Sequence, residues 1–260
     1  MELDTIYNED CRFTMAKMPK DYIDLTVTSP PYDTLRSYNN ADWSFLIFKE
    51  VARELFRITK NGGVVVWVVG DKTYNKSESC SSFLQALYFK EIGFNLHDTM
   101  IYSADKPPLT HNRYEQKFEY MFIFVKGKLN TFNPIMEPCL NPGATRTYGK
   151  GKKNHDELIN GSDKPGHKTK VKTEKIKGNI WHYRVGANDR TDHPAVFPEQ
   201  LAIDHIKSWS NEGDLVYDCF MGSGTTAKCC KVLKRHFIGS EISEEYCQIA
   251  NSRINKDYGN

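Results

Sequence analysis

A run of six apolar residues at positions 64–69, with the sequence VVVWVV, constrains the fold of this chain more than any other feature. A strand with one solvent-exposed face alternates apolar and polar residues. A continuous apolar run is instead typical of a strand buried on both faces. Such strands belong to mostly parallel sheets that helices cover on both sides.

Segments with the patterns of strands and helices alternate around this run. We expect a strand at 23–28 and a helix at about 43–58, which the sequence Asn61-Gly62-Gly63 would end as a C-cap. Further helices are expected at 82–92, 197–208, 225–233 and 243–256, and further strands at 95–103, 119–126, 215–218 and 236–240. This alternation predicts an α/β fold with a doubly wound, mostly parallel sheet and helices on both faces.

Composition excludes several classes of protein. The first ten residues are polar and acidic, unlike a signal peptide, and no apolar run approaches the roughly 20 residues of a membrane helix. The seven cysteines form no CxxC pair, so neither a metal site nor a disulfide framework is expected. We expect a cytoplasmic protein with reduced cysteines, no metal and no membrane partner.

Charge is concentrated between residues 146 and 177, where ten basic residues stand against four acidic ones. The segment has few large aliphatic residues and cannot form a core of its own. It is either a solvated loop or a basic flap that follows a phosphate backbone. The candidate nucleic-acid contacts are Arg113, Arg146, Lys150, Lys152, Lys153, Lys168 and Lys170.

A glycine-rich turn after the expected strand at 215–218 indicates a cofactor site. Asp218 is followed by the sequence CFMGSGTT, in which Gly222 and Gly224 allow a tight turn and a close approach of backbone to ligand. Glu241 ends the next expected strand, where a carboxylate can accept the hydroxyl protons of a ribose. The turn alone also fits a nicotinamide-binding protein, so a second motif must decide.

That motif is Ser29-Pro30-Pro31-Tyr32, at the end of the expected strand 23–28. Two prolines stiffen the turn and donate no hydrogen bonds. The Ser29 hydroxyl and the Pro30 carbonyl can therefore accept both hydrogens of an amino group while Tyr32 stacks on a base. Beside a nucleoside site, this arrangement favours methylation of an amino nitrogen.

In this order of motifs the sequence resembles the amino-methylating DNA methyltransferases of the permuted β class. Their (S/D)PP(Y/F) turn matches residues 29–32, and their FxGxG loop matches residues 220–224. The resemblance implies a Rossmann-like methyltransferase sheet with a basic inserted target-recognition region. Residues 1–126 would be the catalytic half, 127–178 the target-recognition insertion and 179–260 the cofactor-binding half.

The resemblance also assigns roles and partners. The implied catalytic residues are Ser29, Pro30, Pro31 and Tyr32. The implied cofactor-binding residues are Asp10, Cys11, His193, Pro194, Asp218, Phe220, Gly222, Gly224, Thr225 and Glu241. S-adenosylmethionine is the implied cofactor and double-stranded DNA the implied partner. As in restriction-modification systems, a cognate restriction endonuclease is a candidate second partner.

The expected reaction is direct methyl transfer to the exocyclic amine of a base flipped out of the duplex, without metal or covalent intermediate. In the family, serine at the first position of the turn is typical of N4-cytosine enzymes and aspartate of N6-adenine enzymes. Ser29 therefore favours cytosine, and adenine stays as the alternative. Cys139 lacks the partner motif of cytosine-C5 enzymes and is read as structural.

Three remote alternatives belong to other classes. Asp105 with Glu115-Gln116-Lys117 loosely imitates the metal site of a nuclease. The basic segment could serve a non-catalytic nucleic-acid-binding module. Composition also leaves RNA open as the substrate.

Overall fold

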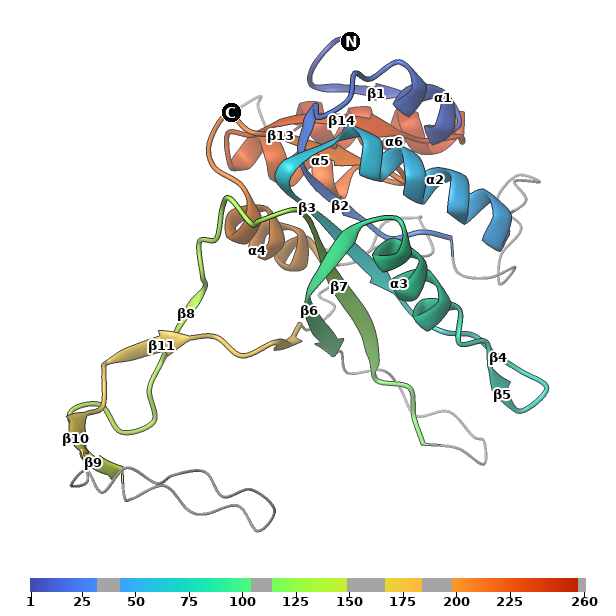
Figure 1. Ribbon diagram of the computed structural model, residues 1–260. Helices are drawn as coiled ribbons and strands as arrows, with labels where there is room; N and C mark the ends of the chain where they lie inside the picture. Colours follow the sequence, from blue (N-terminus) through green and yellow to red (C-terminus); the bar gives the residue numbers. More distant parts are fainter. Residues whose placement is uncertain (32–42, 104–113, 149–166, 184–197, 257–260) are drawn as a thin grey trace. The chain divides into compact units, whose positions relative to one another are not determined.

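The computed structural model describes residues 1–31, 43–103, 114–148, 167–183 and 198–256. The chain divides into two compact units, one made of residues 1–133 and 179–260 and the other of residues 134–178. Each unit is described on its own (Figure 1).

The first unit is built on an eight-stranded sheet. Its strand order is β1 (Thr5–Tyr7), β14 (His236–Ser240), β13 (Leu215–Asp218), β2 (Ile23–Thr28), β3 (Thr59–Val69), β7 (Phe118–Lys126), β6 (Phe94–Ser103) and β12 (Ile180–His182). Strand β7 runs antiparallel to both of its neighbours, and every other neighbouring pair is parallel. The predicted mostly parallel sheet is confirmed.

The six helices among the described residues form two groups. Helices α1 (Cys11–Ala16), α2 (Phe45–Ile58) and α3 (Ser81–Glu91) pack side by side, as do α4 (Glu199–Trp209), α5 (Thr225–Val232) and α6 (Glu244–Lys256). Helix α2 links β2 to β3, and α5 links β13 to β14 in the opposite direction across the sheet. Because such crossovers are right-handed, the two groups cover opposite faces, and the doubly wound prediction is confirmed.

The direction of winding changes between β2 and β13. These strands are neighbours, yet the chain leaves β2 toward β3 and leaves β13 toward β14. Helices diverge at such a switch point, and a crevice opens outside the carboxyl ends of the two strands. The fold therefore favours a ligand site beyond Thr28 and Asp218, the last residues of β2 and β13.

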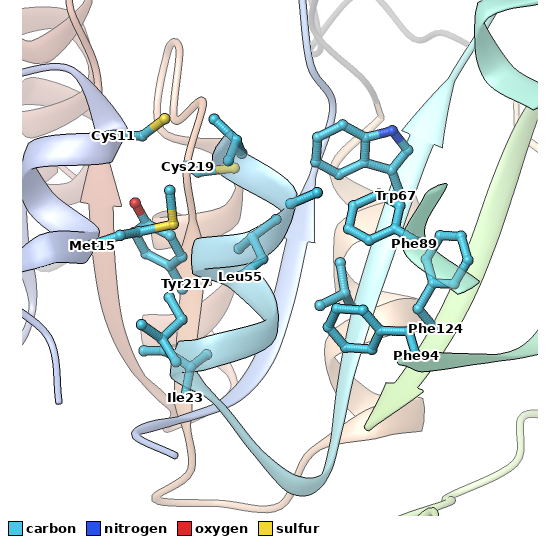
Figure 2. Packing of buried hydrophobic residues seen from close by; sticks show 14 of the residues in the cluster. Cys11, Met15, Ile23, Leu55, Trp67, Phe89, Phe94, Phe124, Tyr217 and Cys219 are labelled. Atoms are coloured by element: carbon cyan, nitrogen blue, oxygen red, sulfur yellow. The ribbon is translucent and has the colours of Figure 1, made fainter. Parts of the chain in front are cut away.

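Aromatic side chains fill the core beneath α2 and α3 (Figure 2). The Phe89 ring centroid lies 5.2 Å from that of Trp67 and 4.6 Å from that of Phe124. The Trp67 indole Nε1 donates a 2.8 Å hydrogen bond to Gln85 Oε1, so its polar atom is satisfied inside the core. All six residues of the run 64–69 are at most 2% exposed, as the continuous apolar pattern predicts.

The expected helix end near residue 58 is confirmed, but the expected C-cap role of Asn61-Gly62-Gly63 is wrong. Helix α2 ends at Ile58, and the glycines lie inside β3. The pairing register with β2 shifts there, from Ile23 opposite Thr59 to Leu25 opposite Val64, so the glycines form a bulge. Gly62 has φ 87°, and a Cβ on it would come within 2.1 Å of the Asn130 side chain. Glycine is needed for this close approach.

Strand β3 begins five residues before the expected run at 64–69. The other expected elements are found with ends shifted by at most two residues; helix α4, for example, begins at Glu199 with Pro198 as its N-cap. Strand β1, helix α1 and the hairpin of β4 (Thr73–Tyr74) and β5 (Ser77–Glu78) were not predicted. They are too short for a periodic pattern to appear.

In the described part of the second unit, the strands form two antiparallel ladders. Strand β8 (Met136–Pro138) pairs with β11 (Glu174–Ile176), and β9 (Thr145–Tyr148) pairs with β10 (His167–Lys170). No side chain whose exposure is described in residues 134–178 is buried. This agrees with the expectation that the basic segment forms no core of its own. Among the described helices of the whole chain, none has the length and apolarity to span a bilayer.

Candidate active site

The carboxyl ends of four neighbouring parallel strands carry most of the described site candidates. Ser29, Pro30 and Pro31 follow β2, and the glycine loop at 219–224 follows β13. Glu241 follows β14, and Asp10 comes three residues after β1. Parallel strands end at the same side of a sheet, so the fold brings together motifs that lie over 200 residues apart in the sequence.

A buried hydrogen-bond cluster joins the turn to the glycine loop. Thr28 Oγ1 donates to Asp218 Oδ1 at 2.7 Å, and Thr226 Oγ1 donates to Asp218 Oδ2 at 2.7 Å. The Phe220 backbone N–H donates to Asp218 Oδ1 at 3.0 Å. Asp218 is only 2% exposed, and its carboxylate ties strand β2, the loop and helix α5 together.

Burial raises the pKa of Asp218 to about 6, although its three hydrogen-bond donors act to lower it. Next to it, Cys219 is 2% exposed, and its Sγ lies 3.5 Å from Thr28 Oγ1. Burial also raises the pKa of this thiol well above its usual range. Cys219 is therefore a small core residue here and not a reactive thiol.

The Glu241 carboxylate is hydrogen-bonded to the glycine loop. The Gly222 N–H donates to Glu241 Oε2, and the Ser243 N–H donates to Oε1, both at 2.8 Å. Burial raises the pKa of Glu241, against the effect of these backbone donors. Each carboxylate oxygen still has a lone pair available, because an ionised carboxylate has about four acceptor positions. The remaining acceptor positions of the Glu241 carboxylate fit the ribose hydroxyls of a nucleoside cofactor.

Gly224 gives the loop its sharp turn into α5. Its φ is 84°, and a Cβ on it would lie 2.8 Å from the Cβ of Ala250 on α6. Both the left-handed backbone and this close packing require glycine.

A residue on α6 that the sequence did not single out braces the same loop. Arg253 Nη1 donates to Ser223 O at 2.6 Å and to Ser223 Oγ at 2.8 Å. Its Nη2 donates to Glu199 Oε1 at 3.0 Å, and Lys228 Nζ lies 3.0 Å from the same oxygen. Arg253 thus links the glycine loop to the start of α4. Its position in an amphipathic helix offered no signal of this contact.

The N-terminal segment lies beside Glu241. Asn8 Nδ2 donates to the Glu241 carbonyl oxygen at 2.9 Å, and the Glu241 N–H donates to Tyr7 O at 3.1 Å. Asp10 caps α1 by accepting from Arg12 N at 2.8 Å. Partial burial raises the pKa of Asp10, but the hydrogen bonds from Arg12 outweigh it, and the net shift is downward. Cys11 is 6% exposed in the core.

Aromatic packing positions Phe220 at the front of the loop. Its ring lies 5.2 Å from Trp43 and 6.3 Å from Trp67, both edge to face. The loop is therefore anchored to β3 as well as to β2 and α6.

Other candidates lie outside this description. Tyr32, Arg113, Lys150, Lys152, Lys153, His193 and Pro194 fall outside the described residues. Arg146 pairs with Thr169 in the β9–β10 ladder of the second unit, where Lys168 and Lys170 are exposed. The described residues contain no group of three side chains arranged to hold a metal ion.

The sheet, with a glycine loop and a proline turn at its switch point, has the Rossmann-like methyltransferase fold. Solved structures agree: the chain has a TM-score of 0.74 to the PvuII cytosine-N4-specific DNA methyltransferase, at 18% identity over 98% of this chain and 87% of that one. It also matches the M1.HpyAVI complex with S-adenosylmethionine, at 25% identity, TM-score 0.62, and 96% and 98% coverage.

Residues 23–252 match the N6/N4 DNA methylase family, and the chain belongs to it. It is 53% identical to the orphan methyltransferase M.BamHII of Bacillus amyloliquefaciens, over 91% of this chain and 89% of the relative. It is 27% identical to the DNA adenine methyltransferase YhdJ of Escherichia coli (strain K12), over 97% and 83%. The protein is an S-adenosylmethionine-dependent DNA amino-methyltransferase.

Proposed function

We propose that this chain is a site-specific methyltransferase of the permuted β class that methylates N4 of a flipped cytosine in double-stranded DNA. The observation that carries the proposal is the Thr28–Asp218 hydrogen bond, because it connects the residue before Ser29 to the residue before the glycine loop. Gly222 of that loop in turn donates to Glu241. The amino-binding turn and the cofactor loop then form one site.

The residues of this site divide the work between them. When bound, S-adenosylmethionine supplies an electrophilic methyl group. Glu241 would accept the ribose hydroxyls, the loop at 222–224 would approach the cofactor through its backbone, and Asp10 would face the adenine. The Ser29 hydroxyl and the Pro30 carbonyl accept the two amine hydrogens, which directs the nitrogen lone pair. Tyr32 stacks on the flipped base.

Asp218 has a positioning role in this account. Its oxygens accept from Thr28, Thr226 and the Phe220 N–H, so it would hold the glycine loop in position for the cofactor. Thr225 is 5% exposed and lies 3.4 Å from Arg253 Nη1, which supports a similar role. Phe220 packs against Trp43, and this contact would fix the backbone near the start of the glycine loop.

The choice of cytosine rests on Ser29. A serine hydroxyl is neutral and accepts an amine hydrogen more weakly than the carboxylate typical of adenine enzymes would. Adenine remains the alternative, since one relative is described as a DNA adenine methyltransferase.

We assign residues 1–126 to the catalytic half, 179–260 to the cofactor half and 127–178 to target recognition. Exposed Lys168 and Lys170 would contact phosphates and position the duplex.

A cognate restriction endonuclease stays open as a partner, because one relative is described as an orphan methyltransferase and others as type II methyltransferases.

The test is mass spectrometry of nucleosides from unmethylated bacterial DNA after incubation with the protein and S-adenosylmethionine. N4-methylcytosine is expected, and N6-methyladenine alone would overturn the choice of base.

Tyr32→Ala should retain cofactor binding and lose most activity, whereas Gly222→Asp should lose cofactor binding itself. Equal cofactor affinity in Gly222→Asp and wild type would contradict the loop assignment.

A further inference from the structure

A short hairpin extends from the carboxyl end of β3, next to the proposed catalytic turn. Strand β2 ends at Thr28, which pairs with Trp67, and β3 continues in the same direction to Val69. The β4–β5 hairpin begins four residues later and projects beyond the sheet (Figure 1). It therefore rises from the side of the sheet on which the site candidates converge.

Hydrogen bonds to Asp71 hold the base of the hairpin in place. Asp71 Oδ1 accepts from Ser79 Oγ at 3.1 Å and from the Ser82 N–H at 3.0 Å. Its other oxygen accepts from Ser82 Oγ. The Ser79 N–H donates to Lys72 O at 2.8 Å. The same carboxylate thus closes the hairpin and caps the first turn of α3, so the hairpin has a defined direction.

The tip of the hairpin is a tight two-residue turn. Asn75 and Lys76 have φ values of 47° and 63°, the left-handed conformation that a type I′ turn needs at both positions. Immediately before them, Tyr74 is 69% exposed. This tight turn thus presents a large aromatic ring to solvent on a hairpin that extends from the carboxyl end of β3. Tyrosine in such a place supplies contact area at a low cost in conformational entropy.

We propose that the β4–β5 hairpin is a DNA-contacting element in which the Tyr74 ring packs against the duplex beside the flipped nucleotide. This rests on the proposed function, because a base that enters the site from a duplex requires that duplex to lie over the carboxyl ends of β2 and β3. Unstacking a base leaves an exposed neighbouring base or sugar face. An aromatic ring can cover such a face whatever the sequence.

The test compares Tyr74→Ala with wild type in transfer of tritiated methyl groups from S-adenosylmethionine to unmethylated bacterial DNA. We expect the KM for DNA to rise about tenfold, the size expected for one lost aromatic contact with a base. Tyr74→Phe keeps the ring and should stay within about twofold of wild type. Leu87→Ala removes a 64% exposed side chain from neighbouring α3 and should change nothing.

A second variant tests the direction of the hairpin. Asp71→Ala retains Tyr74 and removes its anchor, so the KM for DNA should rise while calorimetry finds an unchanged Kd for S-adenosylmethionine. An unchanged KM and kcat in Tyr74→Ala would overturn the proposal, as would equal losses in Tyr74→Ala and Leu87→Ala. If the product is N6-methyladenine, the choice of base fails while the comparison of variants still decides the role of the hairpin.

Discussion

Thr28 Oγ1 and Asp218 Oδ1 are joined by a 2.7 Å hydrogen bond, although 190 positions separate the two residues in the sequence. They are the last residues of neighbouring parallel strands on either side of the switch point. Asp218 in turn fixes Phe220 and Thr226. Asp218 therefore connects the glycine loop to the residue that precedes Ser29.

Asp218 should make folding stability depend on pH. Burial raises its pKa from 3.8 to about 6, so the folded state binds this proton more tightly than the unfolded state does. The associated stabilisation is complete below pH 3.8 and is lost as the pH rises to about 6. The loss should amount to about 3 kcal/mol in the free energy of unfolding.

Asp218→Asn is the matched variant, because it has no titratable group. In urea titrations, the stability of the wild type relative to Asp218→Asn should fall between pH 3.8 and pH 6 and stay constant above that. A difference that is flat with pH would mean that the Asp218 pKa is not raised by burial.

Arg253 should affect cofactor binding from outside the site. Arg253→Met removes the two hydrogen bonds from Nη1 to Ser223 and leaves Glu199 paired with Lys228. We expect the Kd for S-adenosylmethionine to rise about tenfold, which corresponds to about 1.4 kcal/mol. The rate constant of methyl transfer at saturating cofactor should change much less. Isothermal titration calorimetry and single-turnover kinetics separate the two effects.

Arg57→Met is the control for Arg253. Arg57 also braces backbone, donating to Met15 O and Met18 O in the same unit but away from the loop. Its loss should lower stability and leave cofactor affinity unchanged. Equal loss of affinity in both variants would assign Arg253 a general structural role.

Two glycines with the same φ separate backbone strain from steric crowding. Gly213 and Gly224 both have φ 84°, but a Cβ at Gly213 meets no described atom within 4 Å, whereas at Gly224 it meets Ala250 at 2.8 Å. Gly213→Ala should cost about 1 kcal/mol in unfolding free energy. Gly224→Ala should cost about 1–3 kcal/mol more. Urea denaturation gives both values, and equal costs would contradict close packing of α5 on α6.

The fold was largely predictable because its strongest signals are local. The apolar run at 64–69 and the helix and strand patterns on either side each depend on neighbours within a few residues. The bulge at Gly62 was not predictable, since glycine after a helical pattern is read as a C-cap. The close neighbour that requires glycine at this position is the Asn130 side chain, which lies far away in the sequence.

Some residues of the candidate site could be predicted from the sequence and others could not. Gly222, Gly224 and Glu241 belong to a recognisable spacing, and the structure places Glu241 in contact with Gly222. The contacts of Arg253 and Thr28 depend on the packing of distant elements. No pattern of their neighbours could indicate them.

The most direct test of the account is the single-turnover rate of methyl transfer in Thr28→Val. Valine keeps the shape of the side chain and removes the donor to Asp218, whereas Thr28→Ser keeps the donor. If the Thr28–Asp218 hydrogen bond holds the turn next to the glycine loop, Thr28→Val should slow methyl transfer at least tenfold at saturating S-adenosylmethionine. Thr28→Ser should remain near wild type. Wild-type rates in both variants would contradict the claim that the turn and the loop act as one site.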